Sequence, residues 1–242
     1  MKEPAHRFSG PLAEEYELIT LAYPDFEEFQ RGLIAALHQG LAAPQVLELG
    51  TGNGFTTRLL LEIPGADITT VDNDPAMVSQ AREHLENLHA TVHIREADAL
   101  AFLQSLPAES FDAVASAFTL HNFEESYRNT VEAEVYRVLR PGGVFANADK
   151  YAPDGQERFD ALVYQVERFF DAFAPRGKLD LLQRWVTHNI TDQSPRFVMP
   201  AAAAPPRLEA LGFQNVTLTG RSHMQAVLSA RKPGAPGKKG TT

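Results

Sequence analysis

Apolar residues recur at helical spacing near the start of the chain. Between residues 25 and 39 the apolar positions are three or four residues apart: Phe26, Phe29, Leu33, Ile34 and Leu37. This spacing places them on one face of an amphipathic helix, which Gly40 and Pro44 then end. The pattern predicts a helix that packs one apolar face against a core.

The central part of the chain alternates between two kinds of apolar pattern. Short apolar runs typical of buried strands occupy residues 46–49, 68–71, 92–94, 113–117 and 144–148. Segments with helical periodicity separate them, at residues 56–62, 75–88 and 124–139. Strands that alternate with helices imply a parallel sheet covered on both faces, so the sequence predicts a doubly wound α/β domain.

The alternation stops after Tyr151. Residues 156–173 read as a long amphipathic helix, and a less regular helical stretch follows at 179–187. The proline-rich segment 191–206 is then expected to be a loop before a short helix at 207–211. We therefore expect a helical cap between the central sheet and the end of the chain.

Two strand-like runs close the patterned part of the chain. They lie at residues 215–219 and 224–230 and predict an antiparallel hairpin added to the sheet. The segment 233–242 is rich in Gly, Pro and Lys, and we expect it to be disordered. The expected organisation is one domain over 1–232, with residues 1–40 as an N-terminal helical cover and 152–206 as an inserted helical cap.

Composition narrows the classes of function. With 242 residues, 44% of them hydrophobic, the chain can bury the core of one catalytic unit. A net charge of −9 disfavours nucleic acid as a partner, and the absence of cysteine excludes disulfides, thiolate metal sites and cysteine nucleophiles. No signal-peptide core precedes the domain, and no apolar run reaches the length of a membrane span. We expect a soluble cytoplasmic protein.

A glycine-rich turn follows the first predicted strand. Gly50, Gly52 and Gly54 let the backbone bend sharply and approach a ligand closely, although a glycine triplet alone is also typical of a simple tight turn. Dinucleotide-binding loops carry a glycine where this chain has Phe55, and no Gly-Lys-Ser/Thr follows as in triphosphate-binding loops. The loop therefore favours a nucleoside without phosphates.

Acidic residues follow the second and third predicted strands. Asp72 lies about twenty residues after the glycines, where a carboxylate can accept hydrogen bonds from both ribose hydroxyls. Asp74 precedes Pro75 and is interpreted as a helix N-cap. Asp98 has two interpretations that the spacing leaves open, a helix cap or an acceptor for an adenine amino group, with the Ala99 amide as a donor beside it.

Five segments in this order resemble the successive motifs of class I S-adenosylmethionine-dependent methyltransferases: residues 48–54, 71–77, 97–99, 111–114 and 137–143. The resemblance implies a Rossmann-like seven-stranded sheet, mostly parallel with a C-terminal antiparallel hairpin, and S-adenosyl-L-methionine as the cofactor. It places the cofactor contacts at Tyr23, Glu48, Gly50, Gly52, Gly54, Asp72, Asn73, Asp98, Ala99 and Ser116.

A narrower resemblance is to the carboxy-S-adenosylmethionine synthases of tRNA wobble-uridine modification. It rests on residues 72–77, 118–120, the Asp149-Lys150 pair and the long helix before the hairpin. The chain departs from that subgroup at Thr51-Gly52 and at His121-Asn122. Arg184 falls where the subgroup binds the extra carboxylate, and a solvated arginine is the alternative interpretation.

The acceptor of the methyl group should lie at the carboxyl ends of the central strands. His121 is the candidate general base, because histidine is the side chain best suited to accept a proton near neutral pH and this one follows the fourth predicted strand; the alternative is that it only caps a helix. Substrate contacts are expected from Phe118, Lys150, Tyr151 and Arg184, with a solvated Lys150 as the alternative. The histidines form no His-x-x-x-His or His-Glu-x-x-His pattern, so we expect no metal.

The leading hypothesis is a methyltransferase that acts on a small-molecule acceptor by in-line transfer. The alternatives are a carboxy-S-adenosylmethionine synthase and, in another class, a non-catalytic cofactor-binding partner protein. DNA amino-methylation is disfavoured, because residues 116–119 do not form the Asn/Asp-Pro-Pro-Tyr loop of those enzymes. The sequence determines neither the accepting atom nor the oligomeric state, and a homodimer stays open.

Overall fold

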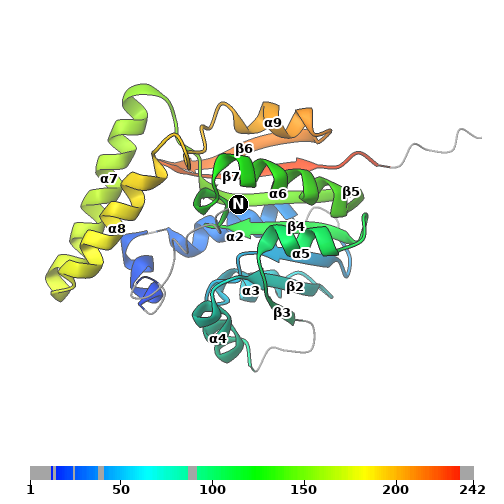
Figure 1. Cartoon of the computed structure of the whole chain (residues 1–242), viewed down its shortest axis with the longest axis horizontal. Coiled ribbons are helices and arrows are strands. Elements are labelled where there is room, and N and C mark those ends of the chain that lie inside the picture. The colour runs from blue at the N-terminus through cyan, green and yellow to red at the C-terminus, as the bar shows by residue number, and fades with distance from the viewer. Residues whose placement is uncertain (1–11, 13–14, 24, 38–40, 87–91, 235–242) are drawn as a thin grey trace, which may run out of the picture.

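The computed structural model describes residues 12, 15–23, 25–37, 41–86 and 92–234. The predicted hairpin and parallel strands form one seven-stranded sheet in this part of the chain, in the order β3-β2-β1-β4-β5-β7-β6 (Figure 1). The strands are β1 Gln45–Leu49, β2 Asp67–Asp72, β3 Val92–Glu96, β4 Phe111–Ala117, β5 Leu139–Lys150, β6 Gln214–Ser222 and β7 Gln225–Arg231. The first five are parallel, whereas β7 runs antiparallel to both β5 and β6. The predicted fold class is confirmed.

Helices cover both faces of this sheet. On one face lie α2 (Phe26–Leu37) and α3 (Phe55–Leu60), and on the other α5 (Ala99–Ser105), α6 (Glu125–Val138) and α9 (Ala204–Ala210). The helix α4 (Pro75–His84) packs along β2 and β3 at the sheet edge (Figure 1). Each central strand therefore has to be apolar on both faces.

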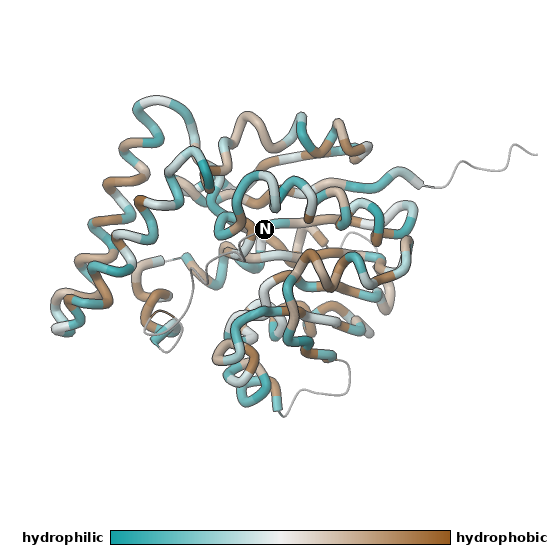
Figure 2. The backbone as a smooth tube through the Cα atoms, in the orientation of Figure 1, coloured by the Kyte–Doolittle hydropathy of each residue, from teal (hydrophilic) through white to brown (hydrophobic). Residues whose placement is uncertain are grey.

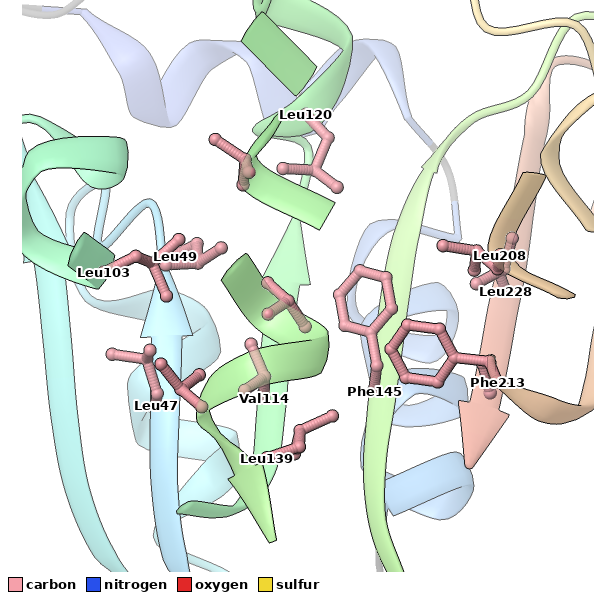
Figure 3. Close-up of a cluster of buried hydrophobic side chains, with 14 of the residues drawn as sticks. Leu47, Leu49, Leu103, Val114, Leu120, Leu139, Phe145, Leu208, Phe213 and Leu228 are labelled. Carbon is pink, nitrogen blue, oxygen red and sulfur yellow. The ribbon is translucent and has the colours of Figure 1, made fainter. Parts of the chain in front are cut away.

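The period-two geometry of the strands divides their side chains between the two layers. Leu47, Val114 and Phe145 face the layer of α5, α6 and α9, where Figure 3 shows them with Leu103 and Leu208. The alternate residues face α2 and α3 and are mostly small, such as the alanines of β4. Because a slip of one residue would exchange the two sets, this pattern fixes the register of the sheet.

The expected cap and N-terminal cover pack against each other. The cap consists of α7 (Gly155–Phe173), the short η4 (Ala174–Arg176) and α8 (Leu179–Asp192), and the 3₁₀ helix η1 (Tyr16–Ala22) lies against it. Figure 1 shows α7 and α8 side by side at one end of the strands, and Figure 2 shows hydrophobic and hydrophilic residues alternating along α7. Their shared core contains Ile19, Phe169, Phe173 and Trp185. The two segments thus cover one end of the sheet jointly.

Several predicted boundaries were wrong. The helix α9 begins at Ala204, because Pro205 and Pro206 fit its first turn, where backbone N–H groups have no partner inside the helix. The helix α8 continues past residue 187 to Asp192, and both η1 and α5 were missed as elements. The predicted helix end at residue 88 and the expected disordered tail from 235 onward lie outside the described residues.

None of the helices in the described ranges combines the length and the apolar character needed to cross a membrane.

Candidate cofactor and acceptor site

The loop between β1 and α3 depends on glycines. Gly50, Gly52 and Gly54 all have positive φ, at 83°, 52° and 88°. A Cβ on Gly50 would lie 1.9 Å from the Thr119 hydroxyl oxygen, so this glycine allows the loop to pack against the segment after β4. A Cβ on Gly52 would meet no atom within 4 Å, and Gly52 lines a cavity at the strand ends. The loop therefore presents bare backbone to that cavity, as a close-fitting ligand requires.

Asp72 joins this loop to the end of β2. One oxygen of its carboxylate accepts the Gly52 N–H at 2.8 Å, and the other accepts the Asp74 N–H at 3.0 Å. Burial raises the pKa of Asp72, while these backbone donors oppose the rise. The carboxylate is thus held rigidly at the cavity wall, next to Asn73. The ribose contact that the sequence predicts for Asp72 requires a carboxylate at the cavity wall, and Asp72 lies there.

Glu48 lies behind the loop and does not line the cavity. Its side chain is fully buried, and Oε2 accepts the Thr57 hydroxyl at 2.5 Å. Within the described part of the chain Oε1 has no hydrogen-bond partner. Burial raises the pKa of Glu48 to about 7. Glu48 therefore supports the loop through its hydrogen bond to Thr57 and does not contact the cavity.

The raised pKa of Glu48 has a consequence for stability. Between its ordinary value of 4.5 and about 7, the folded chain holds a proton that the unfolded chain has released, so stability falls as pH rises through this window. The free energy of unfolding of Glu48→Gln should therefore increase relative to that of wild type between pH 5 and pH 8. We expect this difference to grow by up to roughly 3 kcal/mol. Urea unfolding of both proteins at the two pH values measures this gain. A difference that is independent of pH would contradict the assignment.

The helix-cap interpretation of Asp98 is confirmed, and its adenine contact stays a prediction. It is the N-cap of α5, where Oδ1 accepts the Ala101 N–H at 2.9 Å, and it also lines the cavity with Ala99. Oδ2 accepts the hydroxyl of Tyr127 at 2.8 Å. Asp74 is an N-cap as predicted and accepts the N–H groups of Ala76 and Met77.

The cavity is lined by the ends of β1, β2, β3 and β4 together with residues of η1 and α8. Among its described lining residues, Lys150 is the sole lysine or arginine, whereas Asp72, Asp74 and Asp98 are acidic. The excess of negative charge in the cavity lining would repel phosphates and suits a ligand that is neutral or positively charged. The residues present therefore fit a nucleoside that carries a sulfonium cation.

Aromatic side chains form the wall of the cavity beside the cap. Phe118 has a positive φ of 49°, which turns its ring toward the N-terminal segment. The ring lies 5.4 Å from that of Tyr23 and stacks on Phe26 at 5.6 Å. Tyr23 lines the cavity as predicted, and burial raises the pKa of its hydroxyl. Such rings provide favourable contacts for a cation.

His121 lies in the 3₁₀ turn η3 (Leu120–Asn122) after β4, and its ring is paired with Asp149. Nδ1 lies 2.6 Å from Oδ1 of Asp149, and the His121 backbone N–H donates to Oδ2 at 3.2 Å. Burial would raise the pKa of Asp149, but His121 and Lys150 outweigh it, so the pKa is lowered. An ionised Asp149 accepts the proton on Nδ1, which leaves Nε2 as the basic nitrogen of the ring.

Lys150 is not solvated, which corrects one of the two interpretations of the sequence. It is buried in the cavity wall, and its ammonium donates to Oδ2 of Asp192 at 2.7 Å. Burial alone would lower the pKa of Lys150, but Asp192 and other acidic groups raise it. Lys150 is therefore a cation fixed within the cavity.

Some predicted site residues do not reach the cavity. Tyr151 points into the core, where its hydroxyl accepts from Asn147 at 2.8 Å, and Arg184 lies on the exposed side of α8. Neither residue is among those that line this cavity, so the geometry gives no support to the substrate contacts predicted for them. Ser116 donates to the Leu49 carbonyl inside the sheet, and Gly54 packs against Leu85, so both support the loop from outside the lining.

Arg128 was missed by the sequence analysis. It is fully buried on α6 and donates to the carbonyls of Leu120, Phe123 and Phe197 at 3.0–3.4 Å, and to that of Val198 at 3.1 Å. It thereby ties the turn that carries His121 to the segment before α9. Arg128 stands among other polar residues of α6, so nothing in the local sequence distinguishes it from a solvent-exposed arginine.

Comparisons with known proteins show which proteins the chain resembles. A family described as a methyltransferase domain matches residues 46–143. A carboxy-S-adenosyl-L-methionine synthase of Yersinia pestis (strain Pestoides F) is 30% identical over 153 residues, which are 60% of this chain and 55% of the relative. The chain therefore matches only about half the length of that curated relative.

Solved structures share the fold. A human N-acetylserotonin methyltransferase in complex with SAM superposes with a TM-score of 0.59 at 19% identity, over 90% of this chain and 55% of that one. A phosphoethanolamine N-methyltransferase 2 of Haemonchus contortus, in complex with phosphomonomethylethanolamine and S-adenosylhomocysteine, gives a TM-score of 0.64 at 14% identity, over 92% and 59%. These likenesses concern the fold.

Proposed function

We propose that the chain is a class I S-adenosylmethionine-dependent methyltransferase that transfers a methyl group to a small-molecule acceptor. The observation that carries the proposal is that one cavity, covered by η1 and α8, contains both the cofactor-type residues and His121 with Lys150. A cavity partly covered by the chain's own cap suits a small acceptor better than a macromolecular surface.

S-adenosyl-L-methionine would lie along the strand ends, with its ribose at Asp72 and its adenine near Asp98 and Ala99. When bound, it supplies a methyl group already activated by the sulfonium. The protein then has to hold the acceptor in line with that methyl group, and such positioning can contribute roughly 7–11 kcal/mol to lowering the barrier. Phe118 and Lys150 are the proposed acceptor contacts.

His121 is the proposed proton acceptor for an acceptor that carries an O–H or N–H group. Asp149 supports this role, because it holds the ring with Nε2 as the basic nitrogen. Asp149 is therefore a positioning residue, and His121 would contact the reacting group.

Replacing His121 with alanine should separate catalysis from cofactor binding. We expect kcat to fall about 100- to 10,000-fold, the usual range for loss of a general base, while the Kd of S-adenosylmethionine stays unchanged. The assay follows S-adenosylhomocysteine formation with a pool of small acceptors, and calorimetry gives the Kd. His223→Ala is the matched control, since His223 is exposed and stacks on Tyr164. An equal loss of cofactor affinity in His121→Ala would show that His121 only shapes the pocket.

A second candidate is a carboxy-S-adenosylmethionine synthase, which the curated relatives at 29–30% identity favour. The exposed Arg184 argues against it, because the residue expected to bind the extra carboxylate lies outside the cavity. Incubation with prephenate and S-adenosylmethionine, followed by mass spectrometry of the cofactor, tests this candidate. A carboxylated cofactor would establish it, and an unchanged cofactor would reject it.

A further inference from the structure

A single tyrosine hydroxyl links α6 to the turn between β3 and α5. The Tyr127 hydroxyl donates to Oδ2 of Asp98 at 2.8 Å and accepts the Leu100 backbone N–H at 3.0 Å. Both Tyr127 and Asp98 line the cavity, and Asp98 is the predicted partner of the adenine amino group. We infer that Tyr127 is a positioning residue that holds Asp98 for adenine and thereby determines the selectivity of the site for this base. The inference rests on the proposed function.

The directions of these two hydrogen bonds follow from the groups involved. A backbone N–H can only donate, so the Leu100 N–H uses a lone pair of the Tyr127 oxygen. The one hydroxyl proton is then left for Asp98, whose oxygen accepts it. Burial raises the pKa of Tyr127 and the hydrogen bond to Asp98 adds to the rise, so the hydroxyl keeps this proton. Tyr127 is therefore a fixed donor to Asp98.

The contacts of Asp98 leave room for a donor from a ligand. Its Oδ1 accepts the Ala101 N–H at 2.9 Å, and its Oδ2 accepts the hydroxyl of Tyr127. A carboxylate offers about four acceptor positions, so these two bonds fix its orientation without saturating it. An adenine amino group can donate to such a carboxylate. The oxo group of hypoxanthine can only accept, so at the same position two oxygens would face each other without a proton between them.

The ring of Tyr127 is itself held in place. It lies edge-on to the ring of Phe123, with the centroids 4.9 Å apart and an interplanar angle of 73°, which is a favourable arrangement of aromatic pairs. Phe123 also lines the cavity, and its carbonyl accepts from the buried Arg128 at 3.0 Å. The hydroxyl therefore reaches Asp98 from a firm support, and the two rings provide an apolar wall beside the predicted position of the base.

Loss of the hydroxyl should affect the contact with the base in a specific way. In Tyr127→Phe the Leu100 N–H loses its acceptor, and Oδ2 of Asp98 loses its donor. An unpaired donor is costly, so the Asp98 carboxylate is expected to turn toward the Leu100 N–H. That rotation takes the carboxylate away from the amino group of the base. Selectivity for adenine over hypoxanthine should fall, although the aromatic ring and the cavity wall remain.

Calorimetric titration of the full chain with S-adenosylhomocysteine and with S-inosylhomocysteine, its deaminated analogue, tests the inference. We expect wild type to bind S-adenosylhomocysteine about 10- to 100-fold more tightly, since a hydrogen bond to a charged group distinguishes the two ligands. In Tyr127→Phe this ratio should fall to about 3-fold or less, because only the Kd of S-adenosylhomocysteine rises. Tyr136→Phe is the matched control. Tyr136 lies on the same helix, packs edge-on to Phe213 at 4.9 Å and is not among the described residues that line the cavity.

The possible outcomes separate this inference from the proposed function. A Tyr127→Phe variant that is folded by circular dichroism and keeps the wild-type ratio would overturn the inference. Equal weakening of both ligands in that variant would also overturn it, because the hydroxyl would then only support the fold. Equal affinity of wild type for the two ligands would do the same, whether or not the variant folds. A wild-type chain that binds neither ligand would contradict the proposed cofactor site and, with it, the inference.

Discussion

Replacing Asp72 with alanine is expected to weaken S-adenosylmethionine binding about 100- to 10,000-fold and to abolish methyl transfer at ordinary cofactor concentrations. A hydrogen bond to a charged partner contributes about 1.5–3 kcal/mol, and the proposed ribose contact contains two of them. The carboxylate also holds the N–H groups of Gly52 and Asp74, so its removal loosens the glycine loop as well. Calorimetric titration with S-adenosylmethionine measures the loss.

Two further variants make this result specific. Asp72→Asn keeps one oxygen acceptor and should bind more tightly than Asp72→Ala, though more weakly than wild type. Asp67→Asn, at the other end of β2, is the matched control; Asp67 accepts from Gln45 and lies away from the cavity. Unchanged affinity in Asp72→Ala would remove Asp72 from the cofactor site.

Replacing Arg128 with methionine should be the most destabilising single change proposed for this chain. Methionine has a similar length but cannot donate to the four carbonyls that the guanidinium now satisfies. We expect a loss of about 4 kcal/mol, since removal of a buried charge offsets part of the lost hydrogen bonding. In a chain of this size that corresponds to a Tm lower by roughly 8–16 °C.

Scanning calorimetry of Arg128→Met beside Arg140→Met tests this prediction. Arg140 also pairs with an oxygen, at 2.6 Å from Asp112, but its side chain is 41% exposed, and such pairs contribute about 0–1 kcal/mol. Similar Tm values for the two variants would show that the turn of His121 is held by other contacts.

The fold could be predicted from the sequence because its determinants are local. Short apolar runs, helical spacing and the glycine turn are each patterns within a few neighbouring residues. They predicted the parallel strands, the helices between them and the glycine loop after the first strand. The predicted helix boundaries were wrong where tertiary packing, and not local sequence preference, determines the end of the helix. Pro205 and Pro206 read as a loop but open α9, and α8 runs on to Asp192 because its buried face continues.

The acceptor end of the site could be predicted only in part, because its geometry is nonlocal. His121 and Lys150 follow strands and were found by their place in the alternation. Their partners are separated from them in the sequence by an entire cap, so neither the Lys150–Asp192 pair nor the approach of His188 has a local signal.

Arg184 shows the limit of transfer by resemblance. Its place in the chain matches a carboxylate-binding position of a related subgroup, but the phase of α8 sets it on the exposed face. In contrast, Trp185 and His188 of the same helix point to the buried side. A resemblance gives the order of residues, and the helical phase decides which of them reach the cavity.

The central claim is that the cavity at the strand ends binds S-adenosylmethionine, and the most direct test is native mass spectrometry of the full chain with the cofactor. We expect one molecule of S-adenosylmethionine or S-adenosylhomocysteine per chain, retained by wild type and lost from Asp72→Ala, with no retention of NAD. Retention of NAD in preference, or no retention of either nucleoside by wild type, would contradict the account.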